Sequence, residues 1–218
     1  MKFRKTQRGF TLIEIAIVLL IIGLLLGGVM KGQSMINSAR VRSLANDLSG
    51  IEAAWISFQD RYRSIPGDYG RAATHIKAGI AVGDANAIVD DGEESGAVWQ
   101  HLSAAGFISG SYKATSLTSS ATDDCADDTC PANPFNGFYK ISNSKNALGS
   151  AVESHELSTG GNIPVEVMYE LDLKIDDGNP KTGRLQAFGT GYDACVTGEQ
   201  WNVVEGTADC AGVLRLPL

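Results

Sequence analysis

The sequence of 218 residues lacks the short motifs that mark several common enzyme classes. No G-x-S-x-G, H-E-x-x-H, Walker A or G-x-G-x-x-G pattern is present, so the usual signatures of serine hydrolases, zinc proteases and nucleotide-binding enzymes are missing. The three histidines, His75, His101 and His155, stand singly, and we expect His101 on the solvated face of a helix. These absences favour a structural protein over an enzyme.

Charge is almost missing from one long stretch near the N-terminus. Between Phe10 and Met30 the only charged side chain is Glu14. As a helix this run is roughly 31 Å long, enough to cross the hydrocarbon core of a bilayer. No small-residue cleavage site of the A-x-A kind follows it, which argues against an ordinary secretory signal peptide. A cluster of cations precedes the run: Lys2, Arg4, Lys5 and Arg8. Because a basic flank stays in the cytoplasm, the rest of the chain is expected on the other side.

The remainder of the chain is acidic and holds all four cysteines. The net charge is −7 even with the N-terminal cations included, and such acidity argues against nucleic-acid binding. An even number of cysteines in a translocated domain favours disulfides, and the C-x-x-C pair of many zinc sites is absent. Four cysteines allow three pairings. We predict the local one, Cys125–Cys130 and Cys195–Cys210.

An apolar stripe continues beyond the membrane-length run. Its members are alternately three and four residues apart, as on one face of a helix: Val41, Leu44, Leu48, Ile51, Trp55, Phe58 and Tyr62. Pro66 and Gly67 follow and end the pattern. We predict one helix from Phe10 to about Arg63. Its second half is either part of a domain core or a coiled-coil seam, and the bulky aromatic residues favour the core.

The C-terminal half contains segments typical of strands. Alternating or β-forming residues predict them at Phe138–Ser142, Ile163–Ile175, Gly183–Gly189 and Val213–Leu218. The turn residues of "DDGNP" predict a hairpin between the second and third of these segments. The expected fold class is therefore α+β, with a long N-terminal helix packed on a head domain that contains an antiparallel sheet.

One acidic segment suggests a calcium site. Its oxygen-bearing side chains are Asp84, Asn86, Asp90, Asp91 and Glu94. Several oxygen ligands from one short loop suit calcium, but the spacing does not match an EF-hand. The alternative is a solvated acidic turn, in which Asp91 and Glu94 form a capping box at the start of a helix.

Two further acidic features have competing interpretations. Asp68 follows Pro66-Gly67 and is interpreted as a helix N-cap in preference to a cation ligand. Asp172, Asp176 and Asp177 have the spacing to hold a cation, but turn formation accounts for them more simply.

The segment "KTQRGFTLIEIAIVLLIIGLLLGG" resembles the prepilin signature of type IV pilins and type II secretion pseudopilins. The shared features are the basic leader, Gly9, Phe10, Thr11, Leu12 and Glu14. The resemblance implies that a prepilin peptidase cuts after Gly9 and that Phe10 becomes the methylated N-terminal residue. It also implies that Glu14 pairs with the N-terminal amine of a neighbouring subunit. Pairing makes physical sense, since an unpaired carboxylate in an apolar filament core is costly.

This resemblance implies a division of the chain into four parts. Residues 1–9 are a cleaved cytoplasmic leader, and 10–30 are a transmembrane helix that becomes the filament core. Residues 31–63 are the amphipathic half of the same helix, and 64–218 are an extracytoplasmic α+β head domain. The expected function is that of a structural subunit of a type IV pilus-like filament. Such a subunit needs no cofactor, and calcium is an optional ligand.

The resemblance also implies partners and a location. The partners are other copies or other pilins, the peptidase, the inner-membrane assembly platform and the membrane itself; no nucleic acid is required. The subunit is expected first in the bacterial inner membrane, with a cytoplasmic N-terminus and a periplasmic head. It then enters an extracellular pilus or a periplasmic pseudopilus. The alternatives are a minor type II secretion pseudopilin and a membrane-anchored periplasmic binding protein that does not polymerise.

The sequence departs from many major pilins in one respect. Those proteins have a proline near the end of the apolar run, whereas this chain has Gly23, Gly27, Gly28 and Gly32. Glycine costs roughly 1 kcal/mol relative to alanine within a helix, so the segment is expected either to loosen during assembly or to pack closely against other helices.

Overall fold

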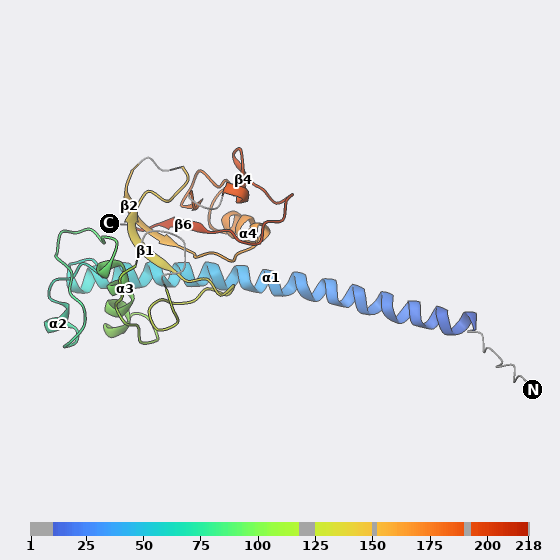
Figure 1. The fold of residues 1–218 in the computed structure, drawn as a ribbon, viewed down its shortest axis with the longest axis horizontal. Helices are drawn as coiled ribbons and strands as arrows, with labels where there is room; N and C mark the ends of the chain where they lie inside the picture. Colours follow the sequence, from blue (N-terminus) through green and yellow to red (C-terminus); the bar gives the residue numbers. More distant parts are fainter. Residues whose placement is uncertain (1–10, 118–124, 150–151, 190–192, 218) are drawn as a thin grey trace, which may run out of the picture. The chain divides into compact units, whose positions relative to one another are not determined.

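The chain is described here by a computed structural model, which covers residues 11–117, 125–149, 152–189 and 193–217 (Figure 1). It forms two compact units, Met1–Ala39 and Arg40–Leu218. The division falls inside the first helix, α1 (Leu12–Tyr62). The second unit therefore includes the C-terminal part of α1.

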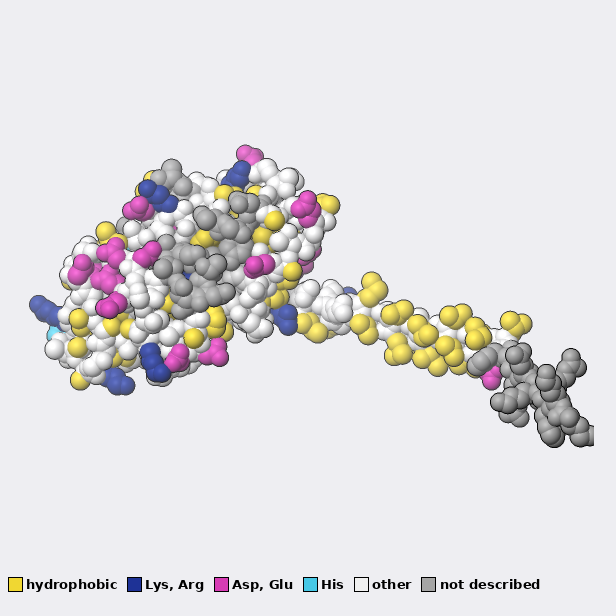
Figure 2. Space-filling view, in the orientation of Figure 1, with side chains coloured by type: hydrophobic (Ala, Val, Ile, Leu, Met, Phe, Trp, Pro, Cys, Tyr) yellow, Lys and Arg dark blue, Asp and Glu magenta, His cyan; other side chains and the backbone are white. Residues whose placement is uncertain are grey.

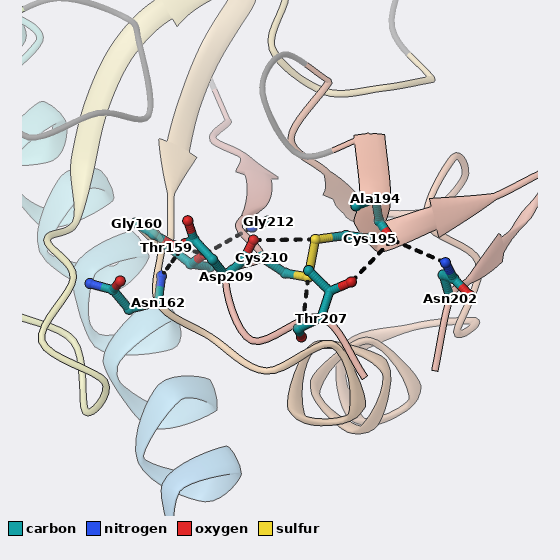
Figure 3. The surroundings of a disulfide bond; sticks show 10 residues. All are labelled: Thr159, Gly160, Asn162, Ala194, Cys195, Asn202, Thr207, Asp209, Cys210 and Gly212. Atoms are coloured by element: carbon teal, nitrogen blue, oxygen red, sulfur yellow. Dashed lines mark hydrogen bonds between the residues drawn. A yellow bond between two sulfur atoms is a disulfide. The ribbon is translucent and has the colours of Figure 1, made fainter. Parts of the chain in front are cut away.

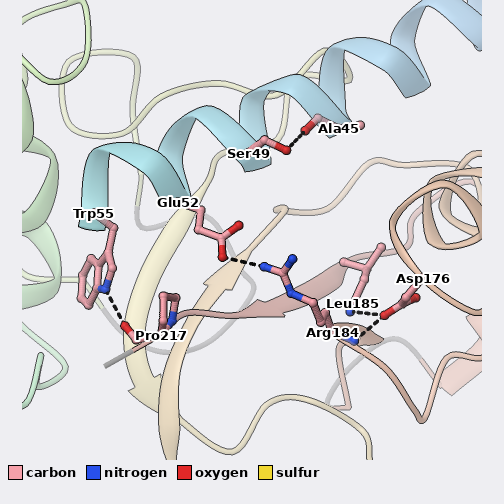
Figure 4. Close-up of polar contacts among 8 residues, drawn as sticks. All are labelled: Ala45, Ser49, Glu52, Trp55, Asp176, Arg184, Leu185 and Pro217. Carbon is pink, nitrogen blue, oxygen red and sulfur yellow. Dashed lines mark hydrogen bonds and ion pairs between the residues drawn. The ribbon is translucent and has the colours of Figure 1, made fainter. Parts of the chain in front are cut away.

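In the second unit, α1 contributes one face to the hydrophobic core. The buried residues of this face are Val41, Leu44, Ala45, Leu48, Ile51, Ala54, Trp55 and Phe58. The predicted apolar stripe is thus a core face and not a coiled-coil seam. Polar contacts also join α1 to the rest of the unit. The indole N–H of Trp55 donates to the carbonyl of Pro217 at 3.0 Å (Figure 4), and the hydroxyl of Tyr139 donates to Asp47 at 3.0 Å.

The principal sheet has four strands in the order β1-β2-β6-β3, and every neighbouring pair is antiparallel. The strands are β1 (Lys140–Ser144), β2 (Ser154–Ser158), β3 (Leu185–Ala187) and β6 (Gly212–Arg215). The predicted α+β class is confirmed. Strand β3 lies within a predicted segment, and β1 and β6 overlap predicted segments, but β2 was missed because "SHELS" has a single apolar residue, Leu157.

The segment predicted as a strand at Ile163–Ile175 is a helix, α4 (Val165–Ile175). Its apolar residues alternate, which is why a strand was predicted. The same segment also contains apolar residues at helical spacing. Val165, Met168 and Leu171 are buried at helical spacing. Glu166 and Lys174 are also good helix formers, and Pro164 with φ −59° precedes the first turn. The "DDGNP" segment consequently joins a helix to a strand, so the hairpin prediction is wrong as well.

The remaining elements are short apart from α3. They are α2 (Ala72–His75), α3 (Glu93–Ala104), a 3-10 turn (Asp193–Cys195), β4 (Val196–Thr197) and β5 (Gln200–Trp201). His101 on α3 is fully buried, which corrects its predicted solvent exposure. Its Nδ1 accepts from the backbone N–H of Gly67 at 2.9 Å, so Nε2 carries the proton and donates to the carbonyl of Ala81 at 2.8 Å.

Two disulfides join the pairs predicted from the sequence, Cys125–Cys130 and Cys195–Cys210. The loop closed by the second is fixed to the segment before α4 (Figure 3). Ile163 and Cys210 exchange backbone hydrogen bonds of 3.3 and 2.8 Å. The N–H of Asn162 donates to Asp209 at 2.7 Å. The disulfide therefore secures both the C-terminal loop and the start of α4.

Candidate functional site

The first unit presents an apolar helical surface. Large hydrophobic residues between Leu12 and Met30 are exposed, with Leu12 93% and Leu24 75% accessible. Figure 2 shows hydrophobic side chains along this helix. This helix is long and apolar enough to cross a membrane. A soluble protein rarely exposes so continuous an apolar surface, so a lipid or protein environment is indicated.

A capping box opens this helix. Thr11 is the residue before the first turn, and its N–H and hydroxyl both donate to Oε2 of Glu14 at 2.8 Å. The N–H of Glu14 in turn lies 3.3 Å from the Thr11 hydroxyl oxygen. The two residues thereby satisfy donors that the first turn of a helix leaves free. The T-x-x-E pattern of this capping box is present in the sequence, where Glu14 was predicted only as an assembly residue.

The other predicted features of the N-terminal segment have different outcomes. Gly9 and Phe10, the predicted processing residues, lie outside the residues that the structure describes. Gly23, Gly27, Gly28 and Gly32 all lie within α1. A Cβ atom at any of these four positions meets nothing within 4 Å. The fold of the single chain therefore gives no reason for glycine at these positions.

Comparison with protein families identifies the N-terminal segment. Residues 4–30 match the family model described as the prokaryotic N-terminal methylation motif. Residues 4–30 therefore carry the signature shared by type IV pilins and pseudopilins, and the apolar helix that follows fits a membrane anchor. The match lies within the first 30 residues, so it says nothing about the head. Comparisons with curated proteins and with solved structures gave no significant match.

The predicted calcium loop contributes to an acidic group whose composition differs from the prediction. Asp68, Asp84 and Glu94 each have an oxygen within 4.8 Å of the others. Asn86 instead donates to Asp84 and Asp90, at 3.1 and 3.3 Å, and Asp91 lies outside the group. The calcium prediction for this loop remains a prediction.

Backbone donors already surround the most buried acid of this group. Both carboxylate oxygens of Asp68 accept N–H groups from the successive residues Ala85, Asn86 and Ala87, at 2.6 to 3.2 Å. Ala85 and Ala87 have φ of 64° and 67°, a backbone arrangement that points successive N–H groups at an anion. Burial nevertheless raises the pKa of Asp68. Backbone donors of the 85–87 segment therefore satisfy both carboxylate oxygens of Asp68.

This arrangement corrects two predicted helix caps. Asp68 does not cap a helix, because Arg71 precedes α2 and no side-chain cap is formed there. Asp91 and Glu94 do not form a capping box, because α3 begins at Glu93 after Gly92. Glu94 instead accepts the N–H groups of Asp84 and Asp90, at 2.9 and 3.1 Å. Asp68 and Glu94 therefore accept backbone N–H groups of the 84–90 loop and do not cap a helix.

The second acidic group lies where α4 ends. Asp172, Asp176 and Asp177 each have an oxygen within 4.8 Å of the others. Burial raises the pKa of Asp172 to about 8, and its hydrogen bond with Asp176 adds to the effect. Burial also opposes ionisation of Asp176, but hydrogen bonds from Asp172 and from backbone N–H groups outweigh it and lower its pKa. The two pKa values are therefore shifted in opposite directions.

Proposed function

We propose that this protein is a structural subunit of a type IV pilus-like filament. In this proposal a prepilin peptidase removes residues 1–9, and Phe10 becomes the methylated N-terminus. Helix α1 anchors the subunit until it enters the filament core. The supporting observation is that the methylation motif at residues 4–30 leads into a helix whose apolar side chains remain exposed in the single chain.

The geometry at Glu14 is compatible with pairing between subunits. Oε2 of Glu14 accepts both hydrogen bonds from Thr11, whereas Oε1 has no partner among the described residues. The N-terminal amine of a neighbouring subunit can therefore approach Oε1 while the cap stays intact. An ion pair of this kind offsets much of the cost of removing a carboxylate from water.

The proposed location follows from the same features. Before assembly the subunit spans the inner membrane, with the cationic flank in the cytoplasm and the head in the periplasm. Its partners there are the peptidase and the assembly platform, and its later partners are other pilin subunits. The two disulfides suit an oxidising compartment of this kind.

The capping box allows a test that separates the charge of Glu14 from its role in the helix cap. Glu14→Gln keeps an oxygen that can accept from Thr11 but removes the charge, whereas Thr11→Val keeps the charge but removes the hydroxyl. We expect Glu14→Gln and Glu14→Ala to abolish filaments in sheared-cell preparations, and Thr11→Val to retain most of them. Wild-type filament yield from Glu14→Gln would contradict the proposed ion pair.

Two measurements test the remaining parts of the proposal. Mass analysis of the mature N-terminus should find a methylated Phe10, and an uncut leader would refute the processing step. The protein should be a component of sheared surface filaments. Its presence only in periplasmic filaments would favour a secretion pseudopilin. Its absence from any filament, in cells that express it, would favour an anchored protein that does not polymerise.

A further inference from the structure

Three carboxylates meet at the C-terminal end of α4. Asp172 lies in the last turn of the helix, Asp176 is the residue after it, and Asp177 follows. The free carbonyls at this end of a helix carry a partial negative charge, so three acids there repel both the helix and one another. Among the described residues, the ion pairs of lysine and arginine involve other acids. No lysine or arginine in the described segments is therefore recorded in an ion pair with this group.

The Asp172 carboxylate is buried and only partly satisfied. The residue has no exposed surface, and its Oδ2 accepts from the indole N–H of Trp201 on β5 at 2.7 Å. Its Oδ1 has no hydrogen-bond donor in the part of the chain that the structure describes. Native proteins rarely leave a buried carboxylate oxygen without a donor or a cation. This oxygen is the observation that distinguishes the group from an ordinary acidic turn.

The loop after α4 holds the other two carboxylates in place. Asp176 accepts the N–H of Leu185 at 3.0 Å, and Asp177 accepts the hydroxyl of Thr182 at 2.6 Å. Gly183, with φ of 78°, makes room for this arrangement, because a Cβ at this position would collide with Oδ2 of Asp176. Carboxylate oxygens have two lone pairs, so these hydrogen bonds leave each side chain able to bind a cation.

We propose that Asp172, Asp176 and Asp177 together bind one calcium ion. The ligands are all carboxylate oxygens, which suit a hard cation and not zinc or copper. Asp172 is buried, Asp176 is half-buried and Asp177 is exposed, so one side of the site is open to water that completes the coordination shell. Calcium tolerates such an irregular set of ligands better than magnesium does.

This site differs from the acidic loop at residues 84–94. There, backbone N–H groups occupy both oxygens of Asp68 and both oxygens of Glu94. At the end of α4, an oxygen of the most buried acid is left without a donor. The inference concerns the head alone and does not depend on whether the protein polymerises.

The test is calcium titration of the full-length chain, purified in detergent and stripped with a chelator. Isothermal titration calorimetry with CaCl₂ should show saturable binding to one site. The expected Kd is about 10⁻⁴ to 10⁻³ M, the range of extracellular calcium modules. Tryptophan emission should change over the same concentrations, because Trp201 is hydrogen-bonded to a proposed ligand. MgCl₂ should bind more weakly.

Three variants locate the site. Asp172→Asn and Asp177→Asn should each weaken calcium binding at least tenfold. Glu170→Gln removes one charge from an exposed position of the same helix and should leave binding unchanged. If circular dichroism shows that Asp172→Asn is unfolded, the exposed Asp177→Asn decides the question. No saturable binding by the wild type up to about 10 mM, well above this Kd range, would overturn the proposal. Unchanged binding by folded Asp177→Asn would overturn it equally.

An Asp84→Asn variant distinguishes the two acidic groups. If calcium binds at the end of α4, this variant should bind as the wild type does. Binding that Asp84→Asn abolishes and Asp177→Asn preserves would place calcium in the 84–94 loop and refute the proposal.

Discussion

The indole N–H of Trp55, which is completely buried in α1, donates to the backbone carbonyl of Pro217 at the other end of the sequence (Figure 4). The 3.0 Å hydrogen bond joins residues separated by 162 positions. It holds the segment after β6 against the helix. The two partners differ in exposure, because Pro217 is accessible to water and Trp55 is not.

This difference in exposure predicts the effect of shortening the chain. Deleting residues 217–218 leaves the buried indole N–H without its acceptor, which should cost about 1–3 kcal/mol of unfolding free energy. Deleting Leu218 alone retains the Pro217 carbonyl and serves as the control. Denaturant unfolding of the full chain and both truncations, followed by circular dichroism, measures the effect. Equal midpoints for the two truncations would show that the hydrogen bond is unimportant.

The two disulfides should contribute unequally to stability. Cys195–Cys210 spans 15 positions and Cys125–Cys130 spans 5, so the first removes more conformational freedom from the unfolded chain. The chain-entropy estimate gives roughly 3 kcal/mol for a loop of the larger size and about 1 kcal/mol less for the smaller one. Thermal unfolding of the two double cysteine-to-alanine variants tests the order. A larger loss from removing Cys125–Cys130 would show that loop length does not control the difference.

The buried histidine on α3 should make the head sensitive to acid. Burial lowers the pKa of His101 below 6.5, because the charged imidazolium loses its contact with water. Protonation of Nδ1 would also place a second donor against the N–H of Gly67. The unfolded chain therefore takes up the proton first as the pH falls. Stability attributable to His101 is complete above pH 6.5 and is lost progressively as the pH falls below it.

His101→Gln tests this expectation. Glutamine can accept from Gly67 and donate to the Ala81 carbonyl without titrating. It loses the stacking of the ring on Phe58 and should cost about 1 kcal/mol at pH 7.5. Its unfolding midpoint should fall less steeply than that of the wild type between pH 7 and 5. Some slope should remain, since burial also lowers the pKa of His155. An unchanged slope would contradict the role of His101.

Features with regular spacing were predictable from the sequence, whereas those that depend on distant partners were not. The stripe from Val41 to Phe58 follows the helical period, and the core uses that face. The burial of His101 depends on backbone groups of a loop, 34 and 20 positions away, that no periodicity reveals. The acids at the end of α4 were visible as a cluster. Trp201, whose indole N–H binds Asp172 from 29 residues further on, was not.

Prediction from local sequence patterns failed where one segment fitted two patterns. The segment from Val165 to Ile175 fits both a two-residue and a helical period, and the packing of Met168 and Leu171 in the core decided for the helix. At Glu14 the prepilin signature implies pairing with a neighbouring subunit, whereas the T-x-x-E pattern indicates a local role as the partner of Thr11. A residue with a predicted assembly function can also cap its own helix, and a pattern of four residues is enough to indicate the cap.

Substitution of glycines in α1 should affect helix stability in the single subunit and filament assembly in opposite directions. No atom blocks a Cβ at Gly27 or Gly28, so replacing both with alanine should raise helix stability by about 1 kcal/mol each. Gly50 lies in the same helix with equally open surroundings, but in the second unit. Gly50→Ala should give a similar gain in stability and leave assembly unchanged.

We expect the Gly27→Ala/Gly28→Ala variant to assemble poorly even though its helix is more stable. This result follows whether the glycines allow α1 to loosen or allow helices of neighbouring subunits to approach closely. The yield of sheared filaments measures assembly, and circular dichroism of the detergent-solubilised subunit measures helicity. If this variant assembles as well as Gly50→Ala, neither role for the glycines can hold. The apolar surface of α1 would then be sufficient for packing without them.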